Sequence, residues 1–136
     1  MAENPNVDLS IPMLPDMELT ATTVAESLGA FIGLEQSKID EVKLALIEAC
    51  INAFEHSRSR ERRIDLSFKI TDKAMTITIG DGGYGVDMDE ALRRIEDKRD
   101  KGEKRGWGLT IITELMDEVD IDSGPSGTLV KMSKYR

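Results

Sequence analysis

The fold of this chain is decided by residues 44–56, which read LALIEACINAFEH. At about 100° per residue, the apolar side chains of this stretch cover roughly 220° of a helical wheel. They are Leu44, Leu46, Ile47, Ala49, Cys50, Ile51, Ala53 and Phe54. A helix of this kind is expected to be largely buried. The remaining wedge holds Glu48, Asn52, Glu55 and His56, with the small Ala45 among them.

Glu48 and Asn52 are the polar pair of this wedge, four residues apart and pointing the same way. A solvated stripe would explain Glu55 well. It explains Asn52 less well, because asparagine is a poor residue for a helix interior. The wall of a cleft is the other interpretation, since an amide oxygen suits a hard cation and a carboxylate can accept a proton. The helix alone leaves both interpretations open, and His56 is interpreted as a helix-dipole partner or a packing residue.

Upstream of this stretch, residues 7–13 are predicted to form a strand that ends at prolines. Asp16 is predicted to cap a following helix, which ends at Gly33. The central helix is predicted over residues 37–56.

Downstream, residues 64–70 and 75–79 alternate between apolar and polar side chains and predict two strands joined by a turn. Gly106 is predicted to open another helix, and residues 119–121 are predicted to pair with residues 128–135 in a final hairpin. The chain is therefore expected to be an α+β protein. Its architecture would be a two-layer α/β sandwich, with a mixed, mostly antiparallel sheet and helices on one face.

Length and composition restrict the class of protein. A chain of 136 residues suits one domain over residues 1–136, whose first six residues are expected to be flexible. The net charge of −8 argues against direct nucleic-acid binding, and the arginines of residues 58–63 are interpreted as a solvated loop. No apolar stretch approaches the roughly 20 residues that cross a bilayer, and no signal peptide is evident. The single cysteine, Cys50, fits a reducing compartment, so a cytoplasmic protein without membrane contact is expected.

Two glycine clusters follow the predicted strands. Asp81 begins the first, which contains Gly83 and Gly85, and a carboxylate at a strand end can accept a hydrogen bond from an exocyclic amine such as that of adenine. Residues 106–108 read Gly-Trp-Gly at the start of a predicted helix, where free amides suit phosphate. Lys104 and Arg105 add positive charge just before it. Between the clusters, 14 of the 19 residues in 87–105 are charged. Such a segment can be a lid that covers the bound ligand, or it can be a plain solvated loop, and the sequence leaves both interpretations open.

Together these motifs resemble the ATP-binding fold shared by gyrase, histidine kinases, heat-shock chaperones and mismatch-repair ATPases. The E-A-x-x-N-A pattern of residues 48–53 is similar to its N box, and D-x-G-x-G of residues 81–85 to its first glycine box. Residues 106–109 resemble the second glycine box, and Gly127-Thr128 the late Gly-Thr element. Within this superfamily, the chain most resembles the anti-sigma factor serine/threonine-protein kinases of bacterial stress response and sporulation. The run GLTIITELMDEV of residues 108–119 is typical of these kinases.

The resemblance implies ATP and Mg²⁺ as cofactors and a role for each motif. Glu48 would be the general base on a partner's serine, and Asn52 would hold Mg²⁺. Asp81 would select adenine with help from Thr128. The remaining nucleotide contacts would come from Gly83, Gly85, Lys104, Arg105, Gly106, Trp107, Gly108 and Leu109. Trp107 departs from the family pattern, because a large residue stands between the two glycines.

The resemblance also implies partners. An anti-sigma factor kinase of this type sequesters a sigma factor and phosphorylates an antagonist with a STAS domain, and such kinases often form homodimers. Two alternatives remain open. One is a switch kinase that holds no sigma factor, and the other is an ATP-dependent binding module whose catalysis has decayed. The intact Glu48 and Asn52 count against decay.

Overall fold

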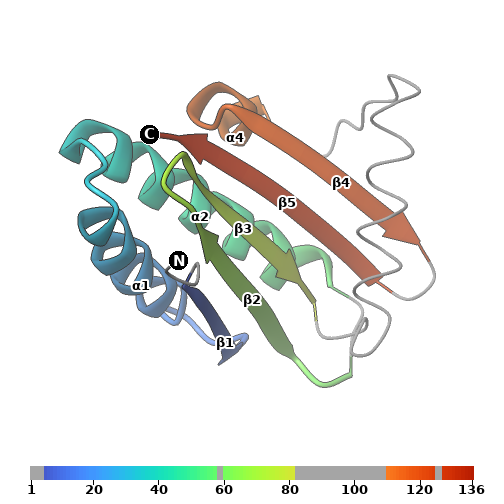
Figure 1. The fold of residues 1–136 in the computed structure, drawn as a ribbon. Helices are drawn as coiled ribbons and strands as arrows, with labels where there is room; N and C mark the ends of the chain where they lie inside the picture. The colour runs from blue at the N-terminus through green and yellow to red at the C-terminus, as the bar shows by residue number, and fades with distance from the viewer. Residues whose placement is uncertain (1–4, 58–59, 82–109, 125–126) are drawn as a thin grey trace.

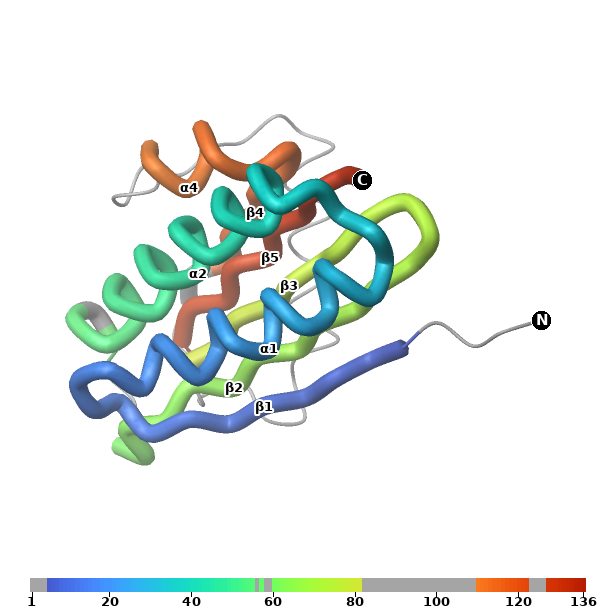
Figure 2. Tube along the Cα trace, turned by 90° about the vertical axis from the view of Figure 1, so that its left-hand side faces the viewer, coloured from blue at the N-terminus to red at the C-terminus, as the bar shows by residue number. Residues whose placement is uncertain are grey.

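The computed structural model describes residues 5–57, 60–81, 110–124 and 127–136. These residues form a single five-stranded sheet, and the helices α1, α2 and α4 cover one of its faces (Figures 1 and 2). In chain order the elements are β1(Asn6–Pro12), α1(Glu18–Phe31), α2(Gln36–His56), β2(Arg63–Ile70), β3(Ala74–Gly80), α4(Thr110–Leu115), β4(Glu118–Gly124) and β5(Gly127–Tyr135). The α+β sandwich predicted from the sequence is confirmed.

The sheet has the strand order β1-β2-β3-β5-β4, and every neighbouring pair among these five strands is antiparallel. The prediction of a mixed sheet was wrong in this detail. Two helices lie between β1 and β2 in the chain. The chain reverses its direction at each of the three connections, so β2 runs antiparallel to β1. The strands β3 and β4 both run against β5, which lies between them, so these two parallel strands never pair.

The core lies between the sheet and the helices. Residues of β2 and β3 alternate as the sequence predicted, and Phe68, Ile77 and Ile79 are buried on the helix-facing side. The helix α1 contributes mainly small buried side chains, and its Gly29 lies so close to α2 that an added Cβ would approach Ile39 Cγ1 to 2.7 Å. The small residues therefore let α1 pack closely on α2.

Two local predictions need correction. Asp16 does not cap α1: Met17 holds the N-cap position without a side-chain hydrogen bond, and Asp16 has a left-handed backbone with φ of 72°. Asp16 instead accepts a hydrogen bond from the Leu19 amide through its carbonyl oxygen. Leu44 does not belong to the buried arc of α2, because its side chain is 56% exposed. The helices α1 and α4 both pack on α2, and Leu44 lies on a side of α2 that neither of them covers.

No helix among the described residues is long and apolar enough to cross a membrane.

Candidate functional site

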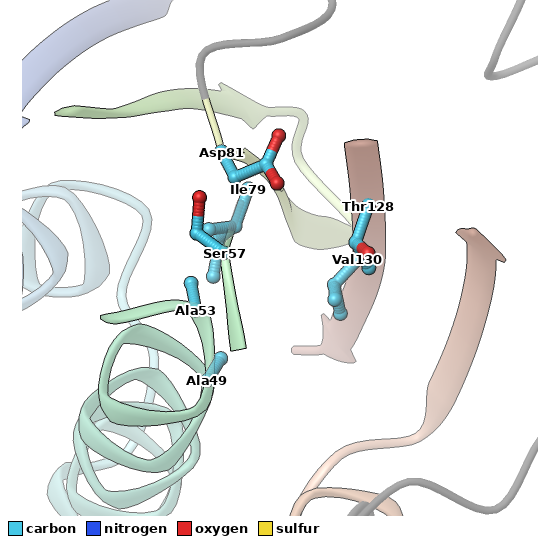
Figure 3. Close-up of a pocket in the computed structure, with 7 residues that line it drawn as sticks. All are labelled: Ala49, Ala53, Ser57, Ile79, Asp81, Thr128 and Val130. Atoms are coloured by element: carbon cyan, nitrogen blue, oxygen red, sulfur yellow. The ribbon is translucent and has the colours of Figure 1, made fainter. Parts of the chain in front are cut away.

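A pocket opens where the C-terminal part of α2 meets the end of β3 and the beginning of β5 (Figure 3). The space at its mouth, open solvent included, is about 290 Å³. Four apolar and three polar residues line it: Ala49, Ala53, Ile79, Val130, Ser57, Asp81 and Thr128. Apolar walls with a few polar groups are typical of a site for a flat organic ligand.

Asp81 and Thr128 are the two predicted site residues that the fold brings together in this pocket. The register of the sheet explains their proximity, because Gly80 pairs with Leu129 at the end of the β3–β5 ladder. Asp81 is only 5% exposed and its carboxylate points into the space between α2 and β5 (Figure 3). A buried carboxylate beside apolar walls can accept hydrogen bonds from a ligand's amine, and the walls can cover the ring that carries this amine.

Gly127 sets how closely β5 approaches Asp81. An added Cβ at Gly127 would lie 2.2 Å from Asp81 Oδ1, and the φ of Gly127 is +131°. Only glycine adopts this conformation without strain. The Gly-Thr pair therefore has a structural reason in this chain: the glycine leaves space for the carboxylate, and the threonine next to it lines the pocket.

We expect Gly127→Ala to displace Asp81 and to destabilise the protein by about 1–3 kcal/mol, because it combines a steric clash with backbone strain. Urea unfolding and nucleotide titration measure the two effects. Gly33→Ala is the matched control, since Gly33 also has a positive φ of 76° but its added Cβ would meet nothing closer than the Arg136 guanidinium at 3.7 Å. Gly33→Ala should lose stability and keep nucleotide affinity. Unchanged nucleotide affinity in Gly127→Ala would contradict the coupling to Asp81.

Glu48 and Asn52 lie on α2, the helix that supplies the pocket wall through Ala49 and Ala53. Asn52 is buried, with 8% of its surface exposed, and Glu48 is half-buried. Ala45, in the same wedge, is completely buried. Within the wedge, Asn52 and Ala45 are therefore directed toward neighbouring elements, whereas Glu55 is exposed. A buried asparagine on this line supports the cleft-wall interpretation over the solvated stripe.

Several predicted site residues lie outside the described residues. They are Gly83, Gly85, Lys104, Arg105, Gly106, Trp107, Gly108 and Leu109, together with the predicted lid of residues 87–105. Conversely, the pocket lining includes five residues that were not predicted as site residues: Ala49, Ala53, Ser57, Ile79 and Val130. Ile79 and Val130 are partners in the β3–β5 ladder, so correct strand pairing would have identified them. Ser57 follows α2 directly, and nothing in the sequence identifies this serine as a pocket residue.

Cys50 is a free, buried thiol in the core beside this site. Burial raises its pKa to about 12, with a smaller contribution from the negative charge of Glu18. The thiolate is the reactive form of cysteine, and it is scarce at neutral pH when the pKa is this high. We therefore expect iodoacetamide at pH 8 to leave native Cys50 unmodified and to alkylate it in denaturant. Rapid alkylation of the native protein, measured by intact mass, would contradict the burial of this side chain.

Comparisons with known proteins agree with this geometry. A sequence model described as "Histidine kinase-like ATPase domain" matches residues 11–134. The chain is 30% identical over 138 residues to the anti-sigma F factor of Caldanaerobacter subterraneus subsp. tengcongensis, covering 99% of this chain and 96% of that protein. It is 30% identical to the anti-sigma F factor of Bacillus subtilis over 93% of this chain and 90% of that protein.

More distant matches have related names. The serine-protein kinase RsbW of Halalkalibacterium halodurans is 26% identical over 95% of this chain and 82% of that protein. A crystal structure of the RsbU and RsbW domains of a Mycobacterium tuberculosis protein superposes with a TM-score of 0.70 at 18% identity. That match covers 97% of this chain, which spans 33% of the length of the solved chain. At this identity the likeness concerns the fold.

Proposed function

This chain belongs to the histidine kinase-like ATPase domain family and is a protein serine/threonine kinase, and from this premise we propose that it acts as an Mg²⁺-dependent anti-sigma factor kinase. One observation carries the proposal. The fold places Asp81 and Thr128 in one pocket, whose wall is the helix that also carries Glu48 and Asn52. The kinase would bind ATP here and transfer a phosphoryl group to a serine of its protein partner.

The residues present fit this ligand and this metal. The pocket offers a buried carboxylate between apolar walls, which suits the amine edge and the faces of adenine. Asn52 carries an amide oxygen one turn after Glu48 on α2. Such an oxygen suits Mg²⁺, because Mg²⁺ in kinases is held by few side chains together with substrate phosphates and water. Bound Mg²⁺ neutralises phosphate charge during phosphoryl transfer.

The proposed chemistry assigns the proton transfer to Glu48. The partner's serine oxygen bonds to the γ-phosphorus of ATP while the bond from this phosphorus to the β–γ bridging oxygen breaks, which releases ADP. Glu48 accepts the serine hydroxyl proton as this happens. The exposure of Glu48 supports this role, since the half-buried carboxylate stays accessible to a second protein. Asn52, one turn further along α2, would hold the metal beside the phosphates.

We expect Asp81→Asn to weaken ATP binding about tenfold to a hundredfold, because the amide adds a donor where the adenine amine also donates. Calorimetric titration of ATP and GTP into both proteins measures the change. Asp122→Asn is a control, since Asp122 is also buried in the sheet, with 2% exposure, but does not line the pocket. An Asp81→Asn protein with wild-type preference for ATP over GTP would remove Asp81 from base recognition.

Partners and location complete the proposal. We propose that the chain sequesters a sigma factor and phosphorylates a STAS-domain antagonist of this sequestration. We further propose that residues 1–136 form one cytoplasmic domain that pairs with a second copy. The names of the relatives support the sigma-factor partner, because the matches at 30% identity are anti-sigma F factors.

Co-elution tests the sigma-factor part of the proposal. Each sigma factor of the source genome is mixed with the chain and ATP and passed over a sizing column, whose elution volume also reports the oligomeric state. We expect one sigma factor to co-elute and to be released when an unphosphorylated antagonist is added. If no sigma factor binds while ATP does, the chain is a switch kinase or an ATP-dependent binding module instead.

A further inference from the structure

Lys134 is a buried cation on the helix-facing side of the sheet. Its side chain is 7% exposed, and it pairs with Met75 across the β3–β5 ladder. Thr128 lines the pocket near the start of β5, and Lys134 lies six residues further on, about 20 Å along the strand. Lys134 is therefore at the opposite end of β5 from the pocket.

The ammonium group of Lys134 connects three elements. Its Nζ lies 3.0 Å from Glu41 Oε1 on α2 and donates a hydrogen bond of 2.5 Å to the carbonyl oxygen of Leu115. Leu115 is the last residue of α4, where backbone carbonyls have no partner within the helix. A cation at a helix C-terminus both satisfies such a carbonyl and interacts favourably with the helix dipole. Lys134 thus fixes the end of α4 to α2 and β5.

Stability alone does not explain a lysine at this position. The Glu41 side chain is 43% exposed, and an ion pair with a solvated partner contributes little net stability. Met132 and Val130 precede Lys134 on the same face of β5 and are both buried, so an apolar residue at 134 would continue their pattern. What the lysine provides and an apolar residue does not is a directional bond to both α2 and α4.

The partner of Lys134 lies on the functional line of α2. Glu41, Glu48 and Asn52 are separated by seven and four residues, and these spacings return to the same side of a helix. The side that carries Glu41 faces Lys134 and the end of α4, so Glu48 and Asn52 continue along the side next to α4. Figure 2 shows α4 beside α2, and the two helices are in contact. The position of α4 therefore affects the surroundings of Glu48 and Asn52.

We infer that Lys134 is a positioning residue for phosphoryl transfer: by bonding to Glu41 and Leu115, it holds α4 against the side of α2 that carries Glu48 and Asn52. This inference rests on the proposed roles of Glu48 and Asn52. Lys134 belongs to β5 but is not among the residues that line the pocket, and it lies at the other end of that strand. Its loss should therefore impair transfer and spare binding of the base.

The test compares Lys134→Met, Lys134→Arg and Glu41→Gln with wild type. We expect Lys134→Met to lower kcat by about tenfold to a hundredfold, as a small displacement of catalytic groups does. The KM for ATP and the affinity for adenosine should change far less, and the thermal midpoint should stay close to that of wild type. Lys134→Arg should recover most of kcat, and Glu41→Gln should fall between the two.

Lys43→Met is the matched control, because Lys43 also forms an ion pair from α2. Its Nζ lies 2.9 Å from Glu26 Oε1, but the Lys43 side chain is 34% exposed, whereas that of Lys134 is 7% exposed. Removing this pair should leave kcat unchanged, since exposed pairs contribute little.

Hydrogen exchange gives a readout that needs no catalysis. Lys134→Met should speed exchange of the Met116 amide, which bonds to the Ile112 carbonyl in the last turn of α4. Wild-type kcat in Lys134→Met would overturn the inference. If wild type itself transfers no phosphoryl group, the proposed function fails, and unchanged exchange at Met116 would then overturn the anchoring as well.

Discussion

Glu48→Gln should bind ATP like the wild-type protein and lose phosphoryl transfer by about 10²- to 10⁴-fold, the contribution of a positioned general base. The substitution keeps the size of the side chain and removes only its ability to take up a proton. Because Glu48 is half-buried, the change should hardly affect the fold. Initial rates of transfer and calorimetric ATP titration measure the two properties separately.

Glu55→Gln is the control for Glu48→Gln. Glu55 lies on the same helix, is exposed and does not line the pocket, so its substitution removes the same charge without touching the proposed site. It should keep wild-type transfer. A Glu48→Gln protein that still phosphorylates its partner at the wild-type rate would remove Glu48 from the role of base.

Asn52→Ala should remove the dependence of ATP binding on magnesium and abolish transfer. In wild type we expect ATP affinity to fall when magnesium is chelated, because the metal links the phosphates to the Asn52 oxygen. The variant has no such oxygen, so its weaker affinity should be the same with and without metal. Asn52 is buried, and its loss should also cost about 1–3 kcal/mol of stability.

Asn52→Asp separates the metal role from the structural one. Aspartate keeps an oxygen ligand of nearly the same shape, so this variant should retain magnesium-dependent binding in part. Urea unfolding of both variants shows how far the fold is affected. If ATP affinity of Asn52→Ala rises with magnesium as in wild type, Asn52 does not hold the metal.

The arrangement of helices and strands could be predicted from the sequence because periodicity is a local property. The alternation of β2 and β3 and the amphipathic α2 follow directly from their residues. The exposure of Leu44 could not be predicted, since it depends on which sides of α2 are covered by α1 and α4. The same holds for Asp16, whose left-handed backbone depends on how the chain leaves β1 for α1.

The candidate site was predicted in part for a similar reason. Asp81 and Thr128 belong to short motifs with recognisable residues, and the fold brings them together. Ile79 and Val130 look like ordinary core residues, and only the β3–β5 register places them in the pocket wall. Lys134 and Glu41 are 93 residues apart in the chain (134 minus 41), and no local pattern relates them. Their pairing is visible only in three dimensions.

Intact mass of a candidate STAS-domain antagonist, after incubation with this chain and Mg-ATP, tests the central claim most directly. We predict the addition of one phosphoryl group, located on a serine and absent when Glu48→Gln replaces wild type. An antagonist of unchanged mass, incubated with wild-type protein that binds ATP and that antagonist, would contradict the account.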